Sequence, residues 1–523
     1  MNKDNHPEIG GRSAKIALAL LVIVYIFNFV DRQILSVLAE EIKADLNISD
    51  SDLGFLFGTA FAVFYSIFGI PLGKLADVWS RKNILSIGLA TWSLMTVLSG
   101  TAKSFTSLSI YRVGVGIGES SASPASYSLL SDYFSPKIRT TILAIYSSGV
   151  YLGAGIGLFL GGWIVELWSS AYPISIDAPF GLKAWQAAFV IVGLPGILLA
   201  FFTWNIKEPK RGGSEGIESQ IEPHPFRLML KEFIGISPFG LITTKEPIKL
   251  LSINALIGSI ISMICFGLYR ITGDTVQWVA FGIGIYFLTC WIQGLKTRDP
   301  VTFEMIFKTK SFILVVFGFP SISFITYSMA AFGPSFYMRN YGITEAEVAT
   351  ILGLITAVSG SIGVISGGII ADKLREKYIN GRLYVGFAVI ILGIPTALAF
   401  LYSKNLYASY VYYALFQIIT PMWVGIAPAT VSDLVLPRMR GLASAFYLLM
   451  VSMIGLALGP YCVGKLSDIY QSTGYSSGEA LKTALATGLL ALIVTAIALT
   501  FACYYLPRDE ASKVERAKAL GEL

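Results

Sequence analysis

Residues 111–124 read YRVGVGIGESSASP and lie inside an apolar segment that is long enough to cross a lipid bilayer. The segment carries Arg112 and Glu119, which are separated by about two helical turns, roughly 10 Å. With Gly116 and Ser123 they follow an i, i+4, i+7, i+11 spacing, which places them on one helix face. Charges at membrane depth normally face a bundle interior or a water-filled cavity. We interpret this face as a polar strip along a transport pathway; the alternative is a structural ion pair inside a helix bundle.

The composition indicates an all-α polytopic membrane protein. Of the 523 residues, 54% are hydrophobic and only 14% are charged, whereas soluble domains carry about 25% charge. The net charge of +6 does not predict nucleic-acid binding. The basic residues fall in short loops between apolar segments, where they set the orientation of a membrane protein.

The sequence predicts no disulfide, no metal site and no cofactor. The four cysteines lie within apolar runs, and the two histidines, His6 and His224, lie in predicted loops or tails. The sequence has no CxxC motif and no Cys/His cluster. The N-terminal residues 1–15 lack a cleavable signal pattern, so the first apolar segment is expected to remain as a membrane anchor.

Apolar stretches of bilayer length predict the spanning helices. Six lie at 15–40, 52–76, 83–101, 106–133, 139–166 and 185–205, and six more at 310–338, 346–372, 383–402, 407–434, 441–468 and 479–506. Two further runs, 249–269 and 276–295, are joined by a turn that contains Arg270 and Asp274. They predict an extra spanning hairpin, which makes fourteen helices; a re-entrant or interfacial pair is the alternative.

The distribution of Lys and Arg predicts that both termini are cytoplasmic. Basic residues gather in alternate loops, for example at Arg81 and Lys82, whereas Glu40, Glu41 and Asp45 dominate a loop on the other side. An inserted hairpin adds two spans, so it leaves both termini on the same side of the membrane. The predicted regions are a cytoplasmic tail (1–14), a six-helix bundle (15–206), a central linker with the hairpin (207–309), a second bundle (310–507) and a cytoplasmic tail (508–523).

The two bundles repeat one another in sequence. Ser131-Asp132-x-x-x-Pro136-Lys137-x-Arg139 matches Ser432-Asp433-x-x-x-Pro437-Arg438-x-Arg440 at a constant offset of 301 positions (433 − 132), which Tyr146 and Tyr447 also keep. The stretch from Gly73 to Asp77 likewise matches the stretch from Gly368 to Asp372. Duplicated halves of this kind are typical of alternating-access transporters.

Several motifs resemble the major facilitator superfamily. The loop GKLADVWSRK at 73–82 resembles its signature after the second helix, although Val78 and Ser80 replace the basic residue and the glycine of the family pattern. Arg112 with its following glycines resembles the fourth-helix motif, and the glycines of 149–161 resemble the fifth-helix motif. The resemblance implies two six-helix bundles with the major facilitator fold, to which the hairpin is added.

Within the superfamily, the sequence looks like the spinster subfamily. The matching elements are NFVDR at 28–32 and GIGES at 116–120. Animal members of this subfamily are implicated in exporting lysolipids and sphingosine phosphate, but the first element also occurs in related organic-anion symporters. The hairpin departs from the twelve-helix spinster plan. Inserted helix pairs occur in proton-dependent peptide transporters, whose first-helix glutamate motif this sequence lacks. The resemblance suggests a bacterial inner-membrane protein.

A proton-coupling constellation is expected in the first bundle. Asp31 and Arg112 lie at similar predicted depths, so they are expected to pair, with Glu119 deeper in the membrane. An anionic substrate group could compete with Asp31 for Arg112, since a guanidinium binds carboxylate or phosphate through two parallel bonds. Asp31 or Glu119 would then carry the coupling proton. The alternative for Asp31 is a local structural pair with Arg32.

Further side chains are predicted to line the pathway or to gate it. The substrate-binding candidates are Arg112, Arg32, Tyr25, Asn28, Ser123, Tyr327, Phe332, Phe336, Gln417 and Trp423. The gating candidates are Gly73, Asp77, Arg81, Asp132, Arg139, Gly368, Asp372, Asp433, Arg440 and Asp468. Asp132 is expected to pair with Arg139, and Asp433 with Arg440, while Asp468 is expected to make a cytoplasmic gate contact. The aromatic candidates have an equally simple alternative, because aromatic residues occur in any membrane helix.

The sequence thus predicts a secondary active transporter of a lipid-like or other organic anion, coupled to protons. The alternatives are a drug/proton antiporter or a sugar-acid symporter of the same superfamily, and a membrane enzyme or receptor built on a transporter scaffold. The sequence has no nucleophile–histidine pair and no P-loop, which argues against an enzyme and against an ATP-driven pump working alone. The expected partners are the substrate, protons and the bilayer, and the expected state is a monomer.

Overall fold

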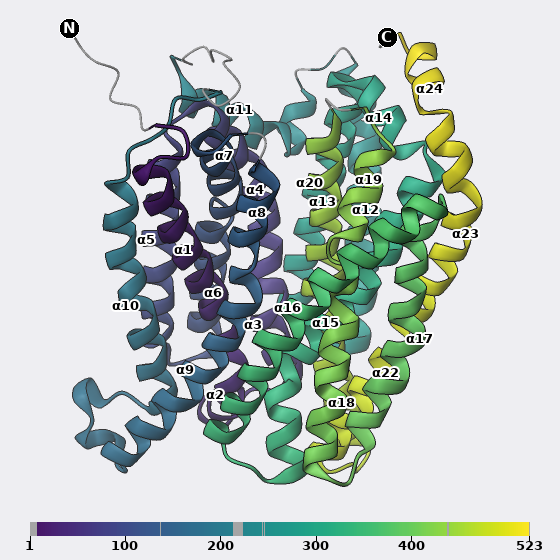
Figure 1. The fold of residues 1–523 in the computed structure, drawn as a ribbon. Coiled ribbons are helices and arrows are strands. Elements are labelled where there is room, and N and C mark those ends of the chain that lie inside the picture. Colours follow the sequence, from purple (N-terminus) through teal and green to yellow (C-terminus); the bar gives the residue numbers. More distant parts are fainter. Residues whose placement is uncertain are drawn as a thin grey trace, which may run out of the picture. The chain divides into compact units, whose positions relative to one another are not determined.

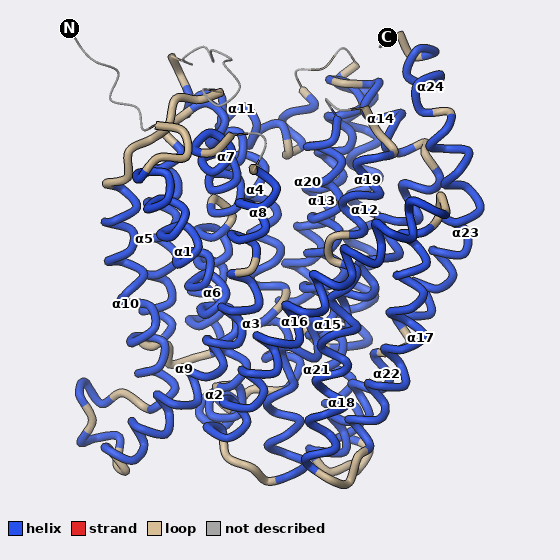
Figure 2. Tube along the Cα trace, viewed as in Figure 1, coloured by secondary structure: helices blue, strands red, loops and turns tan. Residues whose placement is uncertain are grey.

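The computed structural model describes residues 8–135, 138–212, 223–242, 244, 246–436 and 439–521, and the regular elements within these ranges are all helices (Figure 2). Contacts divide the chain into two compact units. Unit 1 comprises Met1–Ile48, Val63–Gly235 and Thr344–Leu354, and unit 2 comprises Ser49–Ala62, Ile236–Ile343 and Ile355–Leu523. Pro136, Lys137, Pro437 and Arg438 of the repeat lie outside the described residues.

Unit 1 is built from long helices that pack side by side (Figure 1). They are α1 (Arg12–Val37), α2 (Ala39–Leu46), α4 (Thr59–Val78), α5 (Arg81–Ser99), α6 (Phe105–Glu119), α7 (Ala122–Tyr133), α8 (Arg139–Ser147), α9 (Gly149–Ala171), α10 (Ala184–Trp204) and α11 (Pro225–Gly235). Two short 3-10 turns, η1 (Ser175–Asp177) and η2 (Pro179–Gly181), precede α10. Only the first residues of α4 belong to unit 2.

Glycines bring α9 close to α1 in unit 1. A Cβ atom at Gly153 would lie 2.5 Å from the carbonyl oxygen of Ile26, and one at Gly157 would lie 2.9 Å from the Cα atom of Val30. Only a residue without a side chain allows this approach. The fifth-helix glycine motif therefore holds α1 in place, and α1 carries Asp31 and Arg32 of the predicted site.

The fourth predicted helix, 106–133, is not continuous. α6 ends at Glu119, and α7 begins at Ala122 after Ser120 and Ser121. Ser120 and Ser121 keep right-handed helical backbone angles, so the interruption is local, and the single helix face predicted for Arg112 and Ser123 stays a prediction. The hydroxyl groups of Ser120 and Ser121 donate to the carbonyls of Ile117 and Gly118, competing with the helix ladder where it ends.

Unit 2 holds the remaining helices. They are α3 (Asp50–Phe57), η4 (Pro238–Leu241), α12 (Pro247–Thr272), α13 (Thr275–Arg298), α14 (Pro300–Phe307), α15 (Lys310–Tyr341), α16 (Glu345–Lys377), α17 (Gly381–Tyr402), α18 (Leu406–Ile419), η5 (Thr420–Trp423), α19 (Ile426–Asp433), α20 (Arg440–Met450), the π-helix η7 (Val451–Leu458), α21 (Gly459–Ser472), α22 (Ser477–Gly488), α23 (Ala491–Ala511) and α24 (Lys513–Ala519). The first residues of α16, up to Leu354, belong to unit 1. The break between α18 and α19 repeats the break between α6 and α7.

The segments predicted to form the hairpin are the adjacent helices α12 and α13, and their insertion as an extra spanning pair stays a prediction. Asn254 of α12 binds the pair together: it accepts from the hydroxyl of Tyr286 at 2.6 Å and donates to Gln293 at 2.8 Å. Such interhelical hydrogen bonds stabilise helix pairs where water is excluded. Both helices are long and apolar enough to cross a membrane.

Length and composition give twelve membrane-capable helices among the described residues, not the fourteen predicted. The two predicted segments that fall short are both helical. α5 begins with Arg81 and Lys82, and the segment of α6 and α7 contains Arg112, Glu119 and Asp132 and is broken into short pieces. The fourteen-helix count is therefore not confirmed.

Candidate functional site

An ion pair joins α1 and α6 in unit 1. The Nε atom of Arg32 donates to Oε2 of Glu119 at 2.6 Å. The Glu119 side chain is 0% exposed, whereas 21% of the Arg32 side chain is exposed. Arg32 is therefore the accessible member of a pair whose acid is enclosed by protein.

Asp31 and Arg112 also meet in unit 1. The guanidinium of Arg112 donates to the main-chain carbonyl of Asp31 at 3.4 Å. Both residues are buried, and the Asp31 carboxylate lies within electrostatic reach of Glu119 and Arg112. Sequence spacing placed these residues at similar depth, but the identity of each partner depends on the rotation of α1 against α6, which spacing does not specify.

Buried polar atoms without a hydrogen-bond partner gather around this pair. Among the described residues they include Oδ1 of Asp31, Oε1 of Glu119, both amide atoms of Asn28 and the hydroxyl groups of Ser126 and Tyr146. Native proteins leave few such groups unsatisfied. These atoms lie on α1, α6, α7 and α8.

Aromatic rings surround the exposed side of Arg32. Its guanidinium lies 4.9 Å from the ring centre of Phe29 and 5.2 Å from that of Tyr65. Tyr25 packs edge-on against Phe29 and stacks on Tyr146, with ring centres 4.3 Å apart. Phe29 and Tyr65 are site residues that sequence analysis missed; the α1 spacing of Tyr25, Phe29 and Arg32 was the available signal for Phe29.

The second-half candidates lie in unit 2, and they are largely buried. Gln417 donates to the hydroxyl of Thr356 at 3.3 Å. Phe336 packs edge-on against Phe400, and Trp423 lies beside Phe319. Phe332 contacts the ring of Phe57, with centres 6.4 Å apart, and Tyr327 lies near Tyr447. Phe336 and Phe332 therefore have packing partners within the unit, as the simpler interpretation predicted.

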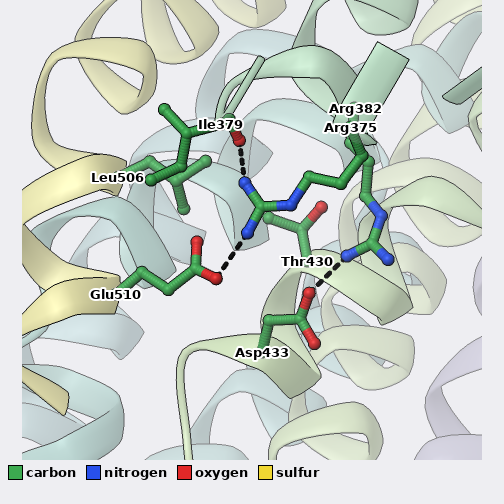
Figure 3. Close-up of a pocket in the computed structure, with 7 residues that line it drawn as sticks. All are labelled: Arg375, Ile379, Arg382, Thr430, Asp433, Leu506 and Glu510. Carbon is green, nitrogen blue, oxygen red and sulfur yellow. Dashed lines mark hydrogen bonds and ion pairs between the residues drawn. The ribbon is translucent and has the colours of Figure 1, made fainter. Parts of the chain in front are cut away.

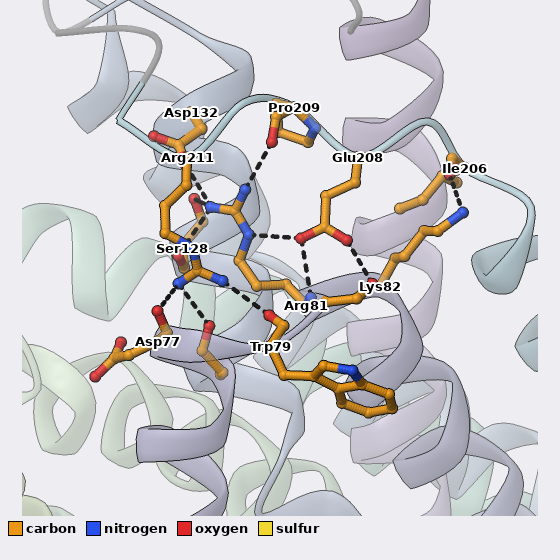
Figure 4. A network of polar contacts seen from close by, with 12 residues as sticks. Asp77, Trp79, Arg81, Lys82, Ser128, Asp132, Ile206, Glu208, Pro209 and Arg211 are labelled. Carbon is orange, nitrogen blue, oxygen red and sulfur yellow. Dashed lines mark hydrogen bonds and ion pairs between the residues drawn. The ribbon is translucent and has the colours of Figure 1, made fainter. Parts of the chain in front are cut away.

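Arg81 is the centre of a polar network at one end of unit 1 (Figure 4). Its side chain is 1% exposed, forms an ion pair with Asp132 and bonds to Glu208 at 3.1 Å. It also donates to the carbonyls of Ser128 and Pro209. Arg81 thereby ties the start of α5 to α7 and to the segment after α10.

Unit 2 contains the repeat of this contact (Figure 3). Arg382 forms an ion pair with Asp433, and Arg375 pairs with Glu510 beside it. Arg382 follows Arg81, and Asp433 follows Asp132, by the same 301 positions (382 − 81). Arg382 was not among the candidates, although the repeat offset was sufficient to identify it.

The predicted braces within each repeat are therefore wrong. Asp132 pairs with Arg81 rather than Arg139, and Asp433 pairs with Arg382 rather than Arg440. Arg139 instead donates to the carbonyl of Ser131. The motif spacing brings Arg139 and Arg440 close in sequence to these acids, but each arginine begins a new helix, α8 or α20.

The remaining gating candidates have mixed surroundings. Asp77 accepts an Arg211 hydrogen bond through its main-chain carbonyl, and Asp372 is 3.8 Å from Arg382 with 76% of its side chain exposed. A Cβ atom at Gly73 would touch Pro124 at 3.9 Å, whereas one at Gly368 would meet nothing within 4 Å. Close packing therefore does not explain Gly368.

Asp468 lies at the end of its helix opposite to Arg440, because Arg440–Ser472 forms one span. If Arg440 is cytoplasmic, as the sequence predicts, Asp468 lies at the external end of the span, so the two predictions exclude one another. Its carboxylate accepts from the backbone N–H groups of Asp50 and Ser51 at 2.9 and 2.8 Å, which caps α3. Arg339 bonds to both oxygens of Asp50 at 2.7 and 2.8 Å. Asp50 and Arg339 were missed because partners this distant in sequence leave no local pattern.

Glu208 lies outside the spanning helices and is strongly hydrogen-bonded. Burial raises the pKa of this carboxyl, but hydrogen bonds from Ser80 and Arg81 outweigh burial and hold the pKa below its ordinary value. The hydroxyl of Ser80 donates at 2.6 Å, and the backbone N–H of Arg81 at 2.9 Å. The carboxylate form of Glu208 is thus part of the Arg81 network.

Comparison with known families agrees with this architecture. The family model described as Major Facilitator Superfamily matches residues 21–460. A relative described as an MFS-type efflux pump from Mycolicibacterium smegmatis is 27% identical over 507 residues, covering 97% of this chain and 95% of that protein. A sphingosine-1-phosphate transporter from Danio rerio is 23% identical, covering 90% of this chain and 79% of that protein.

Solved structures give the same fold. A bacterial homologue of the human lysosomal transporter spinster, crystallised in an inward-facing and unoccupied conformation, superposes with a TM-score of 0.67 at 23% identity. The match covers 97% of this chain and 98% of that one. The resemblance to the spinster subfamily is thereby confirmed.

Proposed function

Since the chain belongs to the major facilitator superfamily, we propose that it is a secondary active transporter of a lipid-like or other organic anion. It is a multi-pass integral membrane protein, and the expectation that it is not an enzyme is confirmed by its transporter relatives. The observation that carries the proposal is the Arg32–Glu119 pair, whose arginine is partly exposed beside aromatic rings.

The chemistry of this pair suits an amphiphile with an anionic head. The guanidinium of Arg32 can bind a phosphate or carboxylate through two parallel bonds. The rings of Phe29, Tyr65 and Tyr25 offer apolar surface next to it. A relative that is a sphingosine-1-phosphate transporter supports this substrate class.

We propose that proton and substrate exchange at the same pair during alternating access. An incoming anion competes with Glu119 for Arg32. Glu119 is then a buried carboxylate without its cation, and in such surroundings the neutral, protonated form is favoured. Asp31, whose Oδ1 atom has no hydrogen-bond partner among the described residues, is the alternative carrier of the coupling proton. Arg112 holds α1 through its hydrogen bond to the main-chain carbonyl of Asp31, and it remains a candidate contact for the anion.

The proposed topology has fourteen spans with cytoplasmic termini in a bacterial inner membrane. The twelve membrane-capable helices already include α12 and α13. α5 and the pair α6–α7 are the additional spans, because α5 packs against both α6 and α10 inside unit 1. In this topology the Arg81 and Arg382 networks are cytoplasmic gate contacts, and the Asp50–Arg339–Asp468 cluster is external.

A drug/proton antiporter is the second candidate, and a sugar-acid symporter the third. The observation that favours the former is the efflux-pump relative, which matches nearly the whole chain. A drug cation would use Glu119 or Asp31 directly and leave Arg32 without a role in binding. Whether proton movement depends on an added anion therefore separates these candidates.

Purified protein in liposomes that contain a pH-sensitive dye tests the proposal. Added lysophosphatidate should change the internal pH, whereas zwitterionic lysophosphatidylcholine and the sugar acid glucuronate should not. A pH change driven by a cationic dye instead would support the antiporter. The variant Arg112→Ala should fold normally but transport poorly. Undiminished transport by this variant would show that Arg112 does not contact the substrate.

A further inference from the structure

The adjacent helices α12 and α13 have no part in the proposed exchange of anion and proton, yet α13 contacts one long span of unit 2. That span runs from Arg440 to Ser472 through α20, η7 and α21. Its π-helix η7 and the following Gly459-Pro460 interrupt the regular α-helical hydrogen bonding. Interruptions of this kind are where a helix can bend. α13 therefore contacts a span that has a point of bending.

The contacts of α13 lie on both sides of the π-helix. Before it, the ring of Trp291 stacks on Phe446, with ring centres 6.0 Å apart. After it, Trp278 meets Tyr461 edge-on, with ring centres 5.3 Å apart. The two contacts are separated by about 20 Å along each helical segment, so α13 runs alongside the span. α13 thereby bridges η7.

A polar contact reinforces the second of these places. The Asp274 carboxylate, in the turn between α12 and α13, accepts from the hydroxyl of Tyr461 at 2.7 Å and lies 3.0 Å from Nζ of Lys465. The side chains of Lys465 and Asp274 are 21% and 25% exposed. Partly exposed ion pairs are weak, so this contact can break and re-form. We call Asp274 with Tyr461 and Lys465 the clip.

One buried side chain of α13 is not explained by packing. Gln277 is 2% exposed and shares a helix face with Gly284, Leu288, Trp291 and Leu295. Both of its amide atoms are buried and have no hydrogen-bond partner within the described ranges of the chain. A leucine would fill this place without leaving two polar atoms unsatisfied, which is unfavourable. A partner that this conformation does not provide would explain the amide.

We propose that the α12–α13 pair is a releasable fastening on the span from Arg440 to Ser472. In this conformation the clip is closed and Gln277 is unsatisfied. When the span bends at η7, the clip opens and the Gln277 amide gains hydrogen-bond partners from α21 or from water. Asp274 thus favours the closed clip, and Gln277 favours the open one. The inference does not depend on which molecule is transported.

Amide hydrogen exchange of residues 451–472, followed by mass spectrometry in the full-length, detergent-solubilised protein, tests the proposal. Asp274→Ala removes both bonds of the clip and should speed this exchange about fivefold. Gln277→Leu removes the group that favours opening and should slow this exchange about fivefold or more. Two substitutions in neighbouring turns of the same chain segment should therefore act in opposite directions.

Glu246→Gln is the matched control, because it breaks an ion pair of the same two helices away from the span. Glu246 lies 3.0 Å from Lys249, and their side chains are 63% and 71% exposed. This variant should leave the exchange of residues 451–472 at the wild-type rate. Lys465→Gln breaks the ion pair of the clip but keeps the Tyr461 bond, so it should speed exchange less than Asp274→Ala does. It also takes the place of Asp274→Ala if that variant does not fold.

Three results would overturn the proposal. Unchanged exchange in both Asp274→Ala and Lys465→Gln would show that the clip does not restrain the span. Faster exchange and a lower Tm in Gln277→Leu would show that the amide already has a partner in this conformation, such as a bound water or lipid. Faster exchange throughout the Asp274→Ala protein, rather than in residues 451–472, would show that the clip only stabilises the fold.

Discussion

At the scale of single residues, the decisive feature is the unequal exposure of Arg32 and Glu119. A buried carboxylate is stable only with its cation or with a proton. In the proposed mechanism, the ligand reaches Arg32 from its partly exposed side while Glu119 stays enclosed. The pair can therefore exchange one partner while the other stays enclosed.

Removing Arg32 should separate its structural and binding roles. Arg32→Gln leaves Glu119 buried without its cation and should lower the free energy of unfolding by about 3 kcal/mol at pH 7. The double variant Arg32→Gln/Glu119→Gln should recover most of this loss, since neither charge remains. Thermal unfolding measures both effects.

Binding of lysophosphatidate provides the control for that pair of variants. Neither the single nor the double variant should bind it, because the guanidinium is absent from both. Recovery of binding together with stability would show that the anion is held elsewhere.

The Glu208 carboxyl gives a prediction about pH. Its pKa in the folded protein lies below the ordinary value, so its contribution to stability is present above about pH 4.3, the value in an unfolded chain, and is lost as the pH falls below it. The Tm difference between wild type and Glu208→Gln should therefore be constant from pH 7 to about pH 5 and narrow at lower pH. A Tm difference that widens as the pH falls would contradict the lowered pKa of Glu208.

At the scale of helices, close glycine contacts position α1 on α9. Apolar length was enough to predict most helices, and glycine spacing singled out the segment of α9 that makes this contact. They did not predict the break at Ser120 and Ser121, because side-chain hydroxyls that bond to the preceding turn also occur in continuous helices.

Gly153→Ala tests the helix contact. The new Cβ atom would lie 2.5 Å from the carbonyl of Ile26 and 2.8 Å from the Cβ atom of Phe29. We expect a loss of about 1–3 kcal/mol in unfolding free energy, since the two helices must separate. Gly69→Ala in α4 is the matched control: its Cβ atom would meet nothing within 4 Å, so stability should be unchanged or rise by up to about 1 kcal/mol. Equal effects at both positions would contradict the packing account.

At the scale of the whole molecule, the sequence repeat predicts structure better than local motif spacing does. The Arg81–Asp132 and Arg382–Asp433 contacts keep one offset, although spacing within the motif suggested Arg139 and Arg440 as partners. Contacts such as Asp50 with Arg339 have no repeat and no local pattern, and only the three-dimensional structure reveals them.

The two repeat contacts should nevertheless differ in strength. Arg81 is almost fully buried and holds two acids, so Arg81→Gln should lower the unfolding free energy by about 3 kcal/mol. The Arg382 side chain is 19% exposed and its partner Asp433 is 38% exposed, so Arg382→Gln should cost less than about 1 kcal/mol. Equal losses in thermal unfolding would show that burial does not set the strength of these contacts.

The central claim is that anion and proton exchange at the Arg32–Glu119 pair, and Glu119→Gln in liposomes tests it most directly. The account predicts that this variant still exchanges lysophosphatidate across the membrane, because the guanidinium remains, but no longer changes the internal pH or accumulates substrate in response to a pH gradient. Two results would contradict the claim. The Glu119→Gln protein could move protons with the substrate as the wild type does, or it could fold normally and yet lose exchange of lysophosphatidate.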